Sequence, residues 1–160
     1  MGRFRFVRAR SYKDYWIINE LSEQCNEEGR DGRFRWCRAS GERNALPFVE
    51  EGTEAKLVVT KERRPRIVGF YTFRSAEKRL DVLYVVPRMR DNGIALDMVN
   101  DFVDQFLDEN ELYVLQPCLA VRRMLNKHFP GLFRAIEVER EESYIVHYSE
   151  EDLRRPGAAY

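Results

Sequence analysis

Apolar and polar residues alternate at the start of the chain, and this period of two is typical of a half-buried strand. Phe4 and Phe6 are its apolar positions, and arginines flank them. Ser11 is then a suitable N-cap for a helix that ends near Gly29. The residues that predict this helix recur every three or four positions: Tyr12, Tyr15, Trp16, Ile18 and Leu21.

Three runs rich in β-branched and aromatic residues follow in the middle of the chain. They cover Lys56–Lys61, Arg66–Arg74 and Arg79–Pro87, and short polar turns join them. Because connections of this length allow only hairpins, the three runs predict an antiparallel meander.

The pattern changes to a helical period after the third run. An apolar stripe extends from Ile94 to Leu107, and Asn110 ends the predicted helix. Leu112–Leu115 is a short apolar run of the buried-strand type. A strand, a long helix and another strand predict a parallel crossover between the third run and Leu112–Leu115. The remaining predicted elements are a helix over Leu119–Phe129 and strands over Leu132–Val138 and Ser143–Tyr148.

These elements predict one mixed α/β (α+β) domain over residues 1–150, followed by a flexible tail over 151–160. Its central mixed sheet has about six or seven strands, antiparallel at first and parallel around the crossover. A length of 160 residues and a 44% content of hydrophobic residues agree with a single packed domain. No apolar run reaches the length of a membrane span, and the N-terminus lacks the apolar region of a signal peptide. We therefore expect a cytoplasmic protein with no membrane partner.

Cysteine and histidine are scarce in this sequence. Cys25, Cys37 and Cys118 form no CxxC pair, and the histidines are His128 and His147. We therefore expect neither a disulfide framework nor a metal site.

Charge is balanced overall but not along the chain. The 27 basic and 27 acidic residues cancel, yet residues 1–80 hold 18 basic and 12 acidic residues, a net charge of +6, and the second half holds the opposite. Arginine outnumbers lysine by 22 to 5. Arginine suits phosphate and carboxylate ligands, so an acidic ligand near the N-terminal half is one interpretation. The other interpretation is that codon bias and solvated faces explain the excess of arginine.

The segment Leu83–Val99 predicts an anion site. A strand there runs into a loop that contains Gly93, and the loop opens a long helix. The first N–H groups of a helix lack intrahelical acceptors, and the helix dipole is positive at that end. Gly93 and Ala95 leave room for a phosphate to approach the backbone closely.

This loop resembles the acyl-CoA pyrophosphate loop of the GCN5-related N-acetyltransferase (GNAT) superfamily. The pattern of that loop is Arg/Gln-x-x-Gly-x-Gly/Ala, and here Arg90, Asp91, Asn92, Gly93, Ile94 and Ala95 fill it. The preceding strand and the order of the predicted elements over nearly the whole chain also match the superfamily. The resemblance implies a twisted sheet with helices on both faces, in which the strand before the loop is splayed from Leu112–Leu115.

The resemblance implies acetyl-CoA as the acyl donor. The backbone amides from Asp91 to Leu96 would bind the pyrophosphate, and the strand edge at Leu83, Tyr84 and Val85 would hydrogen-bond the pantetheine arm as an added strand. A backbone N–H of the same strand would stabilise the oxyanion as an amine attacks the thioester. This reaction requires neither a metal nor a covalent enzyme intermediate.

The sequence departs from the family pattern in the helix after the second parallel strand. Cys118, a predicted cofactor-binding residue, stands where an Asn is expected, and Leu125 stands where a Tyr protonates the departing thiolate. The usual proton donor is therefore missing. A thiol with a pKa of about 8.5 departs fairly well as thiolate, so the loss is tolerable.

Three residues are substitute acid or base candidates: Asp81, Tyr113 and His128. A strict alternation places Asp81 on the same strand face as Val85, where its carboxylate would take a proton from the amine. Each candidate also has a structural interpretation. Asp81 is then a charge at a strand edge, Tyr113 an aromatic residue of the core, and His128 a residue at a helix C-terminus that the helix dipole favours. Cys118 is either a nucleophile or an inert packing residue.

Acceptor recognition is expected from the first helix and from the irregular residues 29–53, which predict a loop or a short helix around 44–51. Arginines and aromatic residues alternate there, a composition that holds phosphates and stacks bases. The alternative is that the aromatic residues anchor the segment while the arginines face water. The predicted acceptor-binding residues are Arg33, Phe34, Arg35 and Trp36.

Together these features predict an N-acetyltransferase that transfers the acetyl group of acetyl-CoA to an amine of an unidentified acceptor in a ternary complex. One alternative is a catalytically degenerate GNAT-like binding module. Another is a nucleic-acid or nucleobase-modifying acyltransferase that uses residues 29–53. The acceptor class and the oligomeric state, including a homodimer, stay open.

Overall fold

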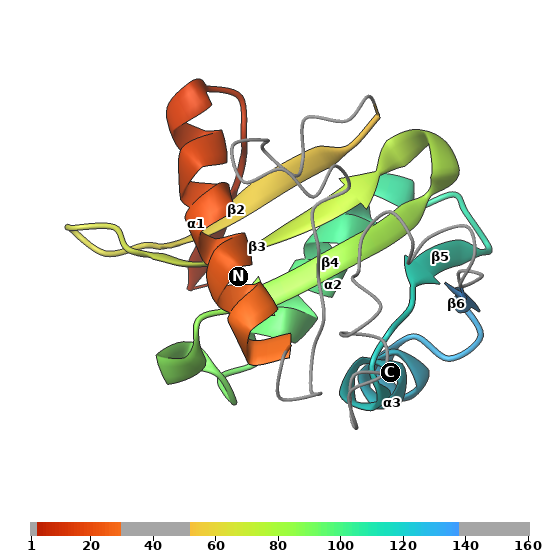
Figure 1. The fold of residues 1–160 in the computed structure, drawn as a ribbon. Coiled ribbons are helices and arrows are strands. Elements are labelled where there is room, and N and C mark those ends of the chain that lie inside the picture. The colour runs from red at the N-terminus through yellow and green to blue at the C-terminus, as the bar shows by residue number, and fades with distance from the viewer. Residues whose placement is uncertain (1–2, 30–51, 138–160) are drawn as a thin grey trace, which may run out of the picture.

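The computed structural model describes residues 3–29 and 52–137, which form one six-stranded sheet with three α-helices (Figure 1). The elements are β1 (Phe4–Arg8), α1 (Tyr12–Gly29), β2 (Glu54–Thr60), β3 (Ile67–Arg74), β4 (Arg79–Val85), α2 (Ile94–Val103), β5 (Leu112–Leu115), α3 (Leu119–His128) and β6 (Phe133–Ile136). Short 3₁₀ turns cover Ser75–Glu77, Pro87–Met89 and Asp104–Phe106. The predicted strand at 143–148, the tail at 151–160 and the acceptor-binding residues Arg33, Phe34, Arg35 and Trp36 lie outside the described residues.

The sheet has the strand order β1-β2-β3-β4-β5-β6. β1 to β4 are antiparallel neighbours, which confirms the meander. β4 and β5 are parallel, which confirms the crossover through α2, and β5 and β6 are also parallel. The described part of the chain is therefore a mixed α/β fold, as the element order predicts.

α1 begins where Ser11 predicts it. The Asp14 amide donates a hydrogen bond of 3.1 Å to Ser11 Oγ, and the Asp14 carboxylate accepts from the amides of Arg10 (3.0 Å) and Ser11 (3.2 Å). These bonds satisfy amides that the helix itself leaves without acceptors. The backbone bond from Arg10 is the main reason that the Asp14 pKa lies below its ordinary value.

The helix predicted to reach Leu107 is shorter than the apolar stripe. α2 ends at Val103, and the chain continues as the 3₁₀ turn Asp104–Phe106. A tightened last turn satisfies carbonyl groups that the α-helix leaves open.

Helices cover both faces of the sheet, with α1 in front of it and α2 behind it in Figure 1. On the α2 face, the Phe73 ring lies 5.4 Å from Tyr71 and 6.0 Å from Phe102 of α2, measured between centroids. On the α1 face, the Tyr84 hydroxyl donates to Gln24 Oε1 of α1 at 3.4 Å. β3 is the strand that both helices bury, and its side chains from Val68 to Phe73 are inaccessible to solvent.

β4 and β5 pair only where they begin. Arg79 lies opposite Tyr113 and Leu80 opposite Val114, and β4 then continues to Val85 without a partner in β5. The two strands therefore part toward their carboxyl ends, and one end of the sheet opens between them.

Gly69 sets how closely the strands and α2 approach one another. A Cβ atom at this position would lie 2.3 Å from the Tyr84 carbonyl oxygen and 2.9 Å from the Met98 Cε atom of α2. Gly69→Ala should therefore lower the free energy of unfolding by about 1–3 kcal/mol through overpacking, measured by urea unfolding. Gly131→Asn is the control, because Gly131 has φ +76° with open space around it, and asparagine tolerates that conformation. A loss at Gly69 no larger than at Gly131 would contradict the close approach.

Candidate functional site

A cleft of about 450 Å³ lies at the end of the sheet where β4 leaves β5. β4, the loop after it, the start of α2 and the first half of α3 line the cleft. Its lining contains all of the predicted cofactor-binding residues except Asn92: Leu83, Tyr84, Val85, Arg90, Asp91, Gly93, Ile94, Ala95, Leu96 and Cys118. Residues that are far apart in the sequence thus meet at one site.

The loop between β4 and α2 holds a conformation that few residues adopt. Asp91 has φ 65° and Gly93 has φ 77°, both in the left-handed region. Asn92 does not line the cleft. Its side-chain amide donates to the carbonyl groups of Met89 (3.0 Å) and Arg90 (3.1 Å), so it fixes the shape of the loop from outside the cleft.

α2 begins at this loop without a side-chain cap. Gly93 is the N-cap residue, and its carbonyl accepts the first helical hydrogen bond from the Asp97 amide at 3.1 Å. No side chain accepts a hydrogen bond from the first amides of α2 at the cap position. Because Gly93, Ile94 and Ala95 line the cleft, the positive end of the helix dipole lies at the cleft wall.

Arg90 adds a full positive charge to the same end. Its Nε donates to the Val85 carbonyl at 2.9 Å, and its guanidinium carbon lies 5.5 Å from the centroid of the Tyr84 ring. The first contact ties the loop to the end of β4, and the second is a cation–π interaction. The loop end of the cleft is therefore suited to an anion.

The opposite wall is apolar. α3 starts after Cys118, and Ala120, Val121 and Met124 of this helix line the cleft. The sequence analysis did not predict these three residues. Met124 follows Val121 by three positions and Ala120 by four, and this spacing is the signal of one helix face. Leu125, at the position of the expected proton donor, is 3% exposed and belongs to the hydrophobic core. The α3 wall of the cleft therefore carries no hydroxyl group.

Asp81 occupies a β-bulge. Thr72 lies opposite Val82 and Phe73 opposite Leu80, so Asp81 is an extra residue of β4 with no partner in β3. The bulge interrupts the alternation at this point, so the pattern along β4 no longer places Asp81 on the face of Val85.

The Asp81 carboxylate is buried beside one cation. It accepts hydrogen bonds from Arg79 Nε (2.6 Å) and Nη2 (3.0 Å), and 7% of its side-chain surface is exposed. Burial raises the Asp81 pKa above its ordinary value, and the Arg79 charge only partly offsets that effect. Asp81 does not line the cleft.

Tyr113 and His128 do not line the cleft either. The Tyr113 hydroxyl donates to a Glu111 carboxylate oxygen at 2.6 Å, and this bond raises the Tyr113 pKa. His128 is exposed at the last position of α3. The structure thus separates all three acid or base candidates from the cleft, with Asp81 as the most buried of them.

No model of a protein family matches this chain, and no curated protein matches it. The described residues contain no group of three or more His, Cys, Asp or Glu side chains placed to hold a metal ion. Within these residues, no helix has the length and hydrophobicity needed to cross a membrane.

The raised Asp81 pKa predicts a pH dependence of stability with a definite sign. Between the ordinary pKa of 3.8 and the raised one, the unfolded chain releases the Asp81 proton while the folded chain keeps it. The folded state then binds more protons, so this contribution to the free energy of unfolding decreases as pH rises through that window. The difference in unfolding free energy between wild type and Asp81→Asn should fall from about pH 4 toward pH 7, measured by urea unfolding.

Glu62→Gln provides a control of opposite sign. Hydrogen bonds from Arg66 and Thr60 lower the Glu62 pKa, so the contribution of Glu62 is lost as pH falls. A difference for Asp81→Asn that rises with pH, as for Glu62→Gln, would show that the Arg79 charge outweighs burial.

Proposed function

We propose that this protein is an acyl-CoA-dependent N-acyltransferase with a GNAT-like fold, and that it transfers an acetyl group from acetyl-CoA to an amine. The observation that carries the proposal is the cleft between β4 and α3, at the end of the sheet where β4 leaves β5. Its loop end combines the uncapped start of α2 with Arg90, and its α3 wall is apolar. An elongated ligand with an anionic head and a less polar arm fits both ends.

The residues of the cleft fit the two parts of acetyl-CoA by their chemistry. The amides from Asp91 to Leu96 would bind the pyrophosphate, because they lie at the positive end of the α2 dipole. The edge of β4 from Leu83 to Val85 has no β5 partner and would hydrogen-bond the arm as a neighbouring strand does. The thioester supplies an acyl group that an amine attacks directly, and a β4 amide would stabilise the oxyanion.

Because Asp81 does not line the cleft, we propose that it accepts the proton of the attacking amine through water and not by direct contact. It is the buried member of the three candidates, and its raised pKa brings it nearer to the pH at which a general base works well. The Tyr113 hydroxyl is already bound to Glu111, which makes it a weaker acid. The departing thiolate needs no donor at Leu125, because a thiol pKa of about 8.5 makes it a fair leaving group.

One observation favours a second function. The α3 wall consists of Cys118, Ala120, Val121 and Met124, and Leu125 is directed into the core. A cleft that binds acyl-CoA without a proton donor on this wall would also serve a catalytically degenerate binding module. The two functions share the ligand and differ in turnover.

The proposed pyrophosphate site is tested by a charge placed at the start of α2. Ala95→Glu should abolish the binding of acetyl-CoA in calorimetry, because the carboxylate would lie at the cleft wall where the diphosphate binds. Asn100→Glu adds the same charge to an exposed position of the same helix and should leave the affinity unchanged. Unchanged affinity in Ala95→Glu would refute the assignment of the loop.

The role of Asp81 is tested by turnover. Release of the CoA thiol is followed with a panel of primary amines, and Asp81→Asn should slow it by about 10²–10⁴ while the affinity for acetyl-CoA is unchanged. Retained turnover would move the role to Tyr113 or to water. Binding of acetyl-CoA without thiol release by the wild-type protein for any amine would favour the binding module.

A further inference from the structure

Exposed basic side chains gather at the end of the sheet formed by the turn between β2 and β3. We call this surface the basic edge, and it comprises Arg3, Lys61, Arg63, Arg64, Arg66 and Arg88. These residues come from three segments: the start of β1, the β2–β3 turn and the 3₁₀ turn after β4. The cluster is therefore a product of the fold and not only of the local run KERRPR.

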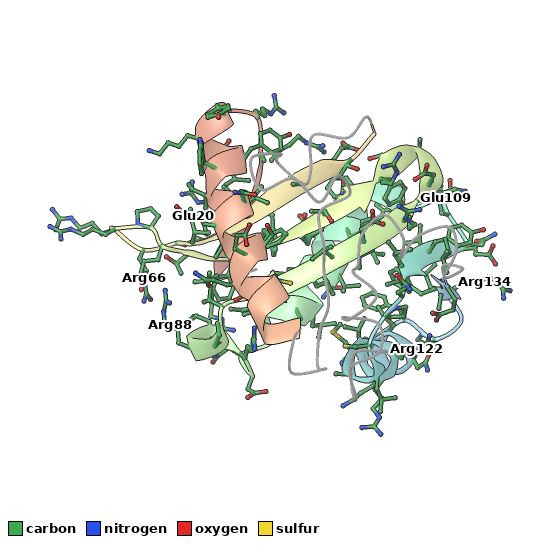
Figure 2. All side chains as sticks on the ribbon, viewed as in Figure 1. Glu20, Arg66, Arg88, Glu109, Arg122 and Arg134 are labelled. Carbon is green, nitrogen blue, oxygen red and sulfur yellow. The ribbon has the colours of Figure 1, made fainter. Side chains whose placement is uncertain are left out.

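Backbone hydrogen bonds hold the three segments together. The Lys61 amide donates to the Arg3 carbonyl at 3.2 Å, which joins the β2–β3 turn to the start of β1. The Val86 amide donates to the Val68 carbonyl at 2.9 Å, which places the turn that contains Arg88 next to the start of β3. Figure 2 shows Arg66 and Arg88 on the same side of the molecule.

Most of these charges have no acidic partner. Arg66 forms an ion pair with Glu62 at 3.0 Å. No ion pair joins Lys61, Arg63, Arg64 or Arg88 to another residue in the parts of the chain that the structure describes. These four side chains are exposed, so their donors face solvent and are available to an anionic ligand.

The opposite part of the molecule carries charges of both signs. The end of α2 and the segment after it carry Asp104, Asp108, Glu109 and Glu111. Glu109 lies on the side of the molecule away from Arg66 and Arg88 in Figure 2. Lys78 pairs with Glu109 and Arg134 with Glu111, so opposite charges lie beside these two carboxylates, in contrast to the unpaired cations of the basic edge.

We propose that the basic edge binds the phosphate backbone of a nucleic acid. Arginine forks match phosphate oxygens, and a row of unpaired arginines on a projecting turn releases counterions from a phosphodiester chain. The proposal does not depend on the acyltransferase function. It concerns a surface other than the irregular residues 29–53, and it assigns backbone binding without base specificity.

The composition of the edge favours a nucleic acid over an acidic protein or a membrane. Interfaces between proteins have an apolar or aromatic centre, and interfacial membrane segments insert apolar side chains. The exposed large hydrophobic residues of the described chain are Val7, Tyr12, Trp16, Leu107 and Leu119, and none belongs to the β2–β3 turn or to the turn with Arg88. A purely charged, hydrated surface is typical of contacts with phosphates.

The experiment measures fluorescence anisotropy of a labelled single-stranded DNA of about 20 nucleotides and of the matching duplex and RNA, with the full chain. The variant Arg63→Glu/Arg64→Glu should weaken binding at least about tenfold at low salt and reduce the slope of log K against log salt by about 2. Both side chains are exposed, so the fold should tolerate the change. Arg123→Glu/Lys127→Glu alters the same number of charges on the exposed side of α3 and should leave binding unchanged.

Four outcomes would overturn the proposal. The wild-type protein does not bind any of the three nucleic acids at about 50 mM salt, where phosphate contacts are still strong. The Arg63 and Arg64 variant binds them as the wild type does. Polyglutamate or vesicles with phosphatidylserine bind as tightly as the nucleic acids, which would identify an acidic protein or a membrane. The Arg63 and Arg64 variant binds acetyl-CoA more weakly in calorimetry but binds the nucleic acids as before, which would assign the two arginines to the cofactor. Failure of the wild-type protein to bind acetyl-CoA would contradict the acyltransferase proposal alone.

Discussion

The parting of β4 from β5 is the constraint on which the cleft depends. Arg79 pairs with Tyr113 and Leu80 with Val114, and beyond these two pairs the strands diverge. The unpaired edge of β4 exposes backbone N–H and C=O groups that need hydrogen-bond partners. Two contacts on the β4 side accompany the divergence. Arg90 satisfies the Val85 carbonyl at the end of β4, and Gly69 lets α2 pack against β3 and β4 without displacing them. If the strands closed, the backbone edge and the apolar wall would bury each other and the cleft would disappear.

The cleft joins two surfaces that differ in chemistry. Its loop end has the positive start of α2 and the Arg90 charge, and Asn92 fixes the shape of that loop from outside. Its α3 wall has Val121 and Met124, whose apolar side chains offer no hydrogen bond. A small anion would satisfy only the first surface and an apolar ligand only the second. A ligand gains from both only if it is long and carries its charge at one end.

The sequence predicted what depends on local pattern, and missed what depends on neighbours in space. The alternation at Phe4 and Phe6, the Ser11 cap and the glycine at position 93 each act within a few residues, and the elements they predict are present. The bulge at Asp81 depends on the register between β3 and β4, which the pattern along β4 alone does not contain. The apolar wall from α3 was missed for a similar reason, because the half of a helix that faces a cleft has the same period as the half that faces the core.

The Asp81–Arg79 pair is unusual among the ion pairs of this protein. At Glu62, which is exposed, the arginine partner lowers the carboxyl pKa, whereas at Asp81 burial has the larger effect and the pKa rises despite two hydrogen bonds. A buried pair of this kind is weak evidence for stability, because apolar residues of similar volume serve a core at least as well. The carboxylate also lies at a bulge, the kind of irregularity that redirects a side chain beside a site. Burial thus explains the raised pKa of Asp81, and the shift in register at the bulge explains why the alternation along β4 does not place its side chain.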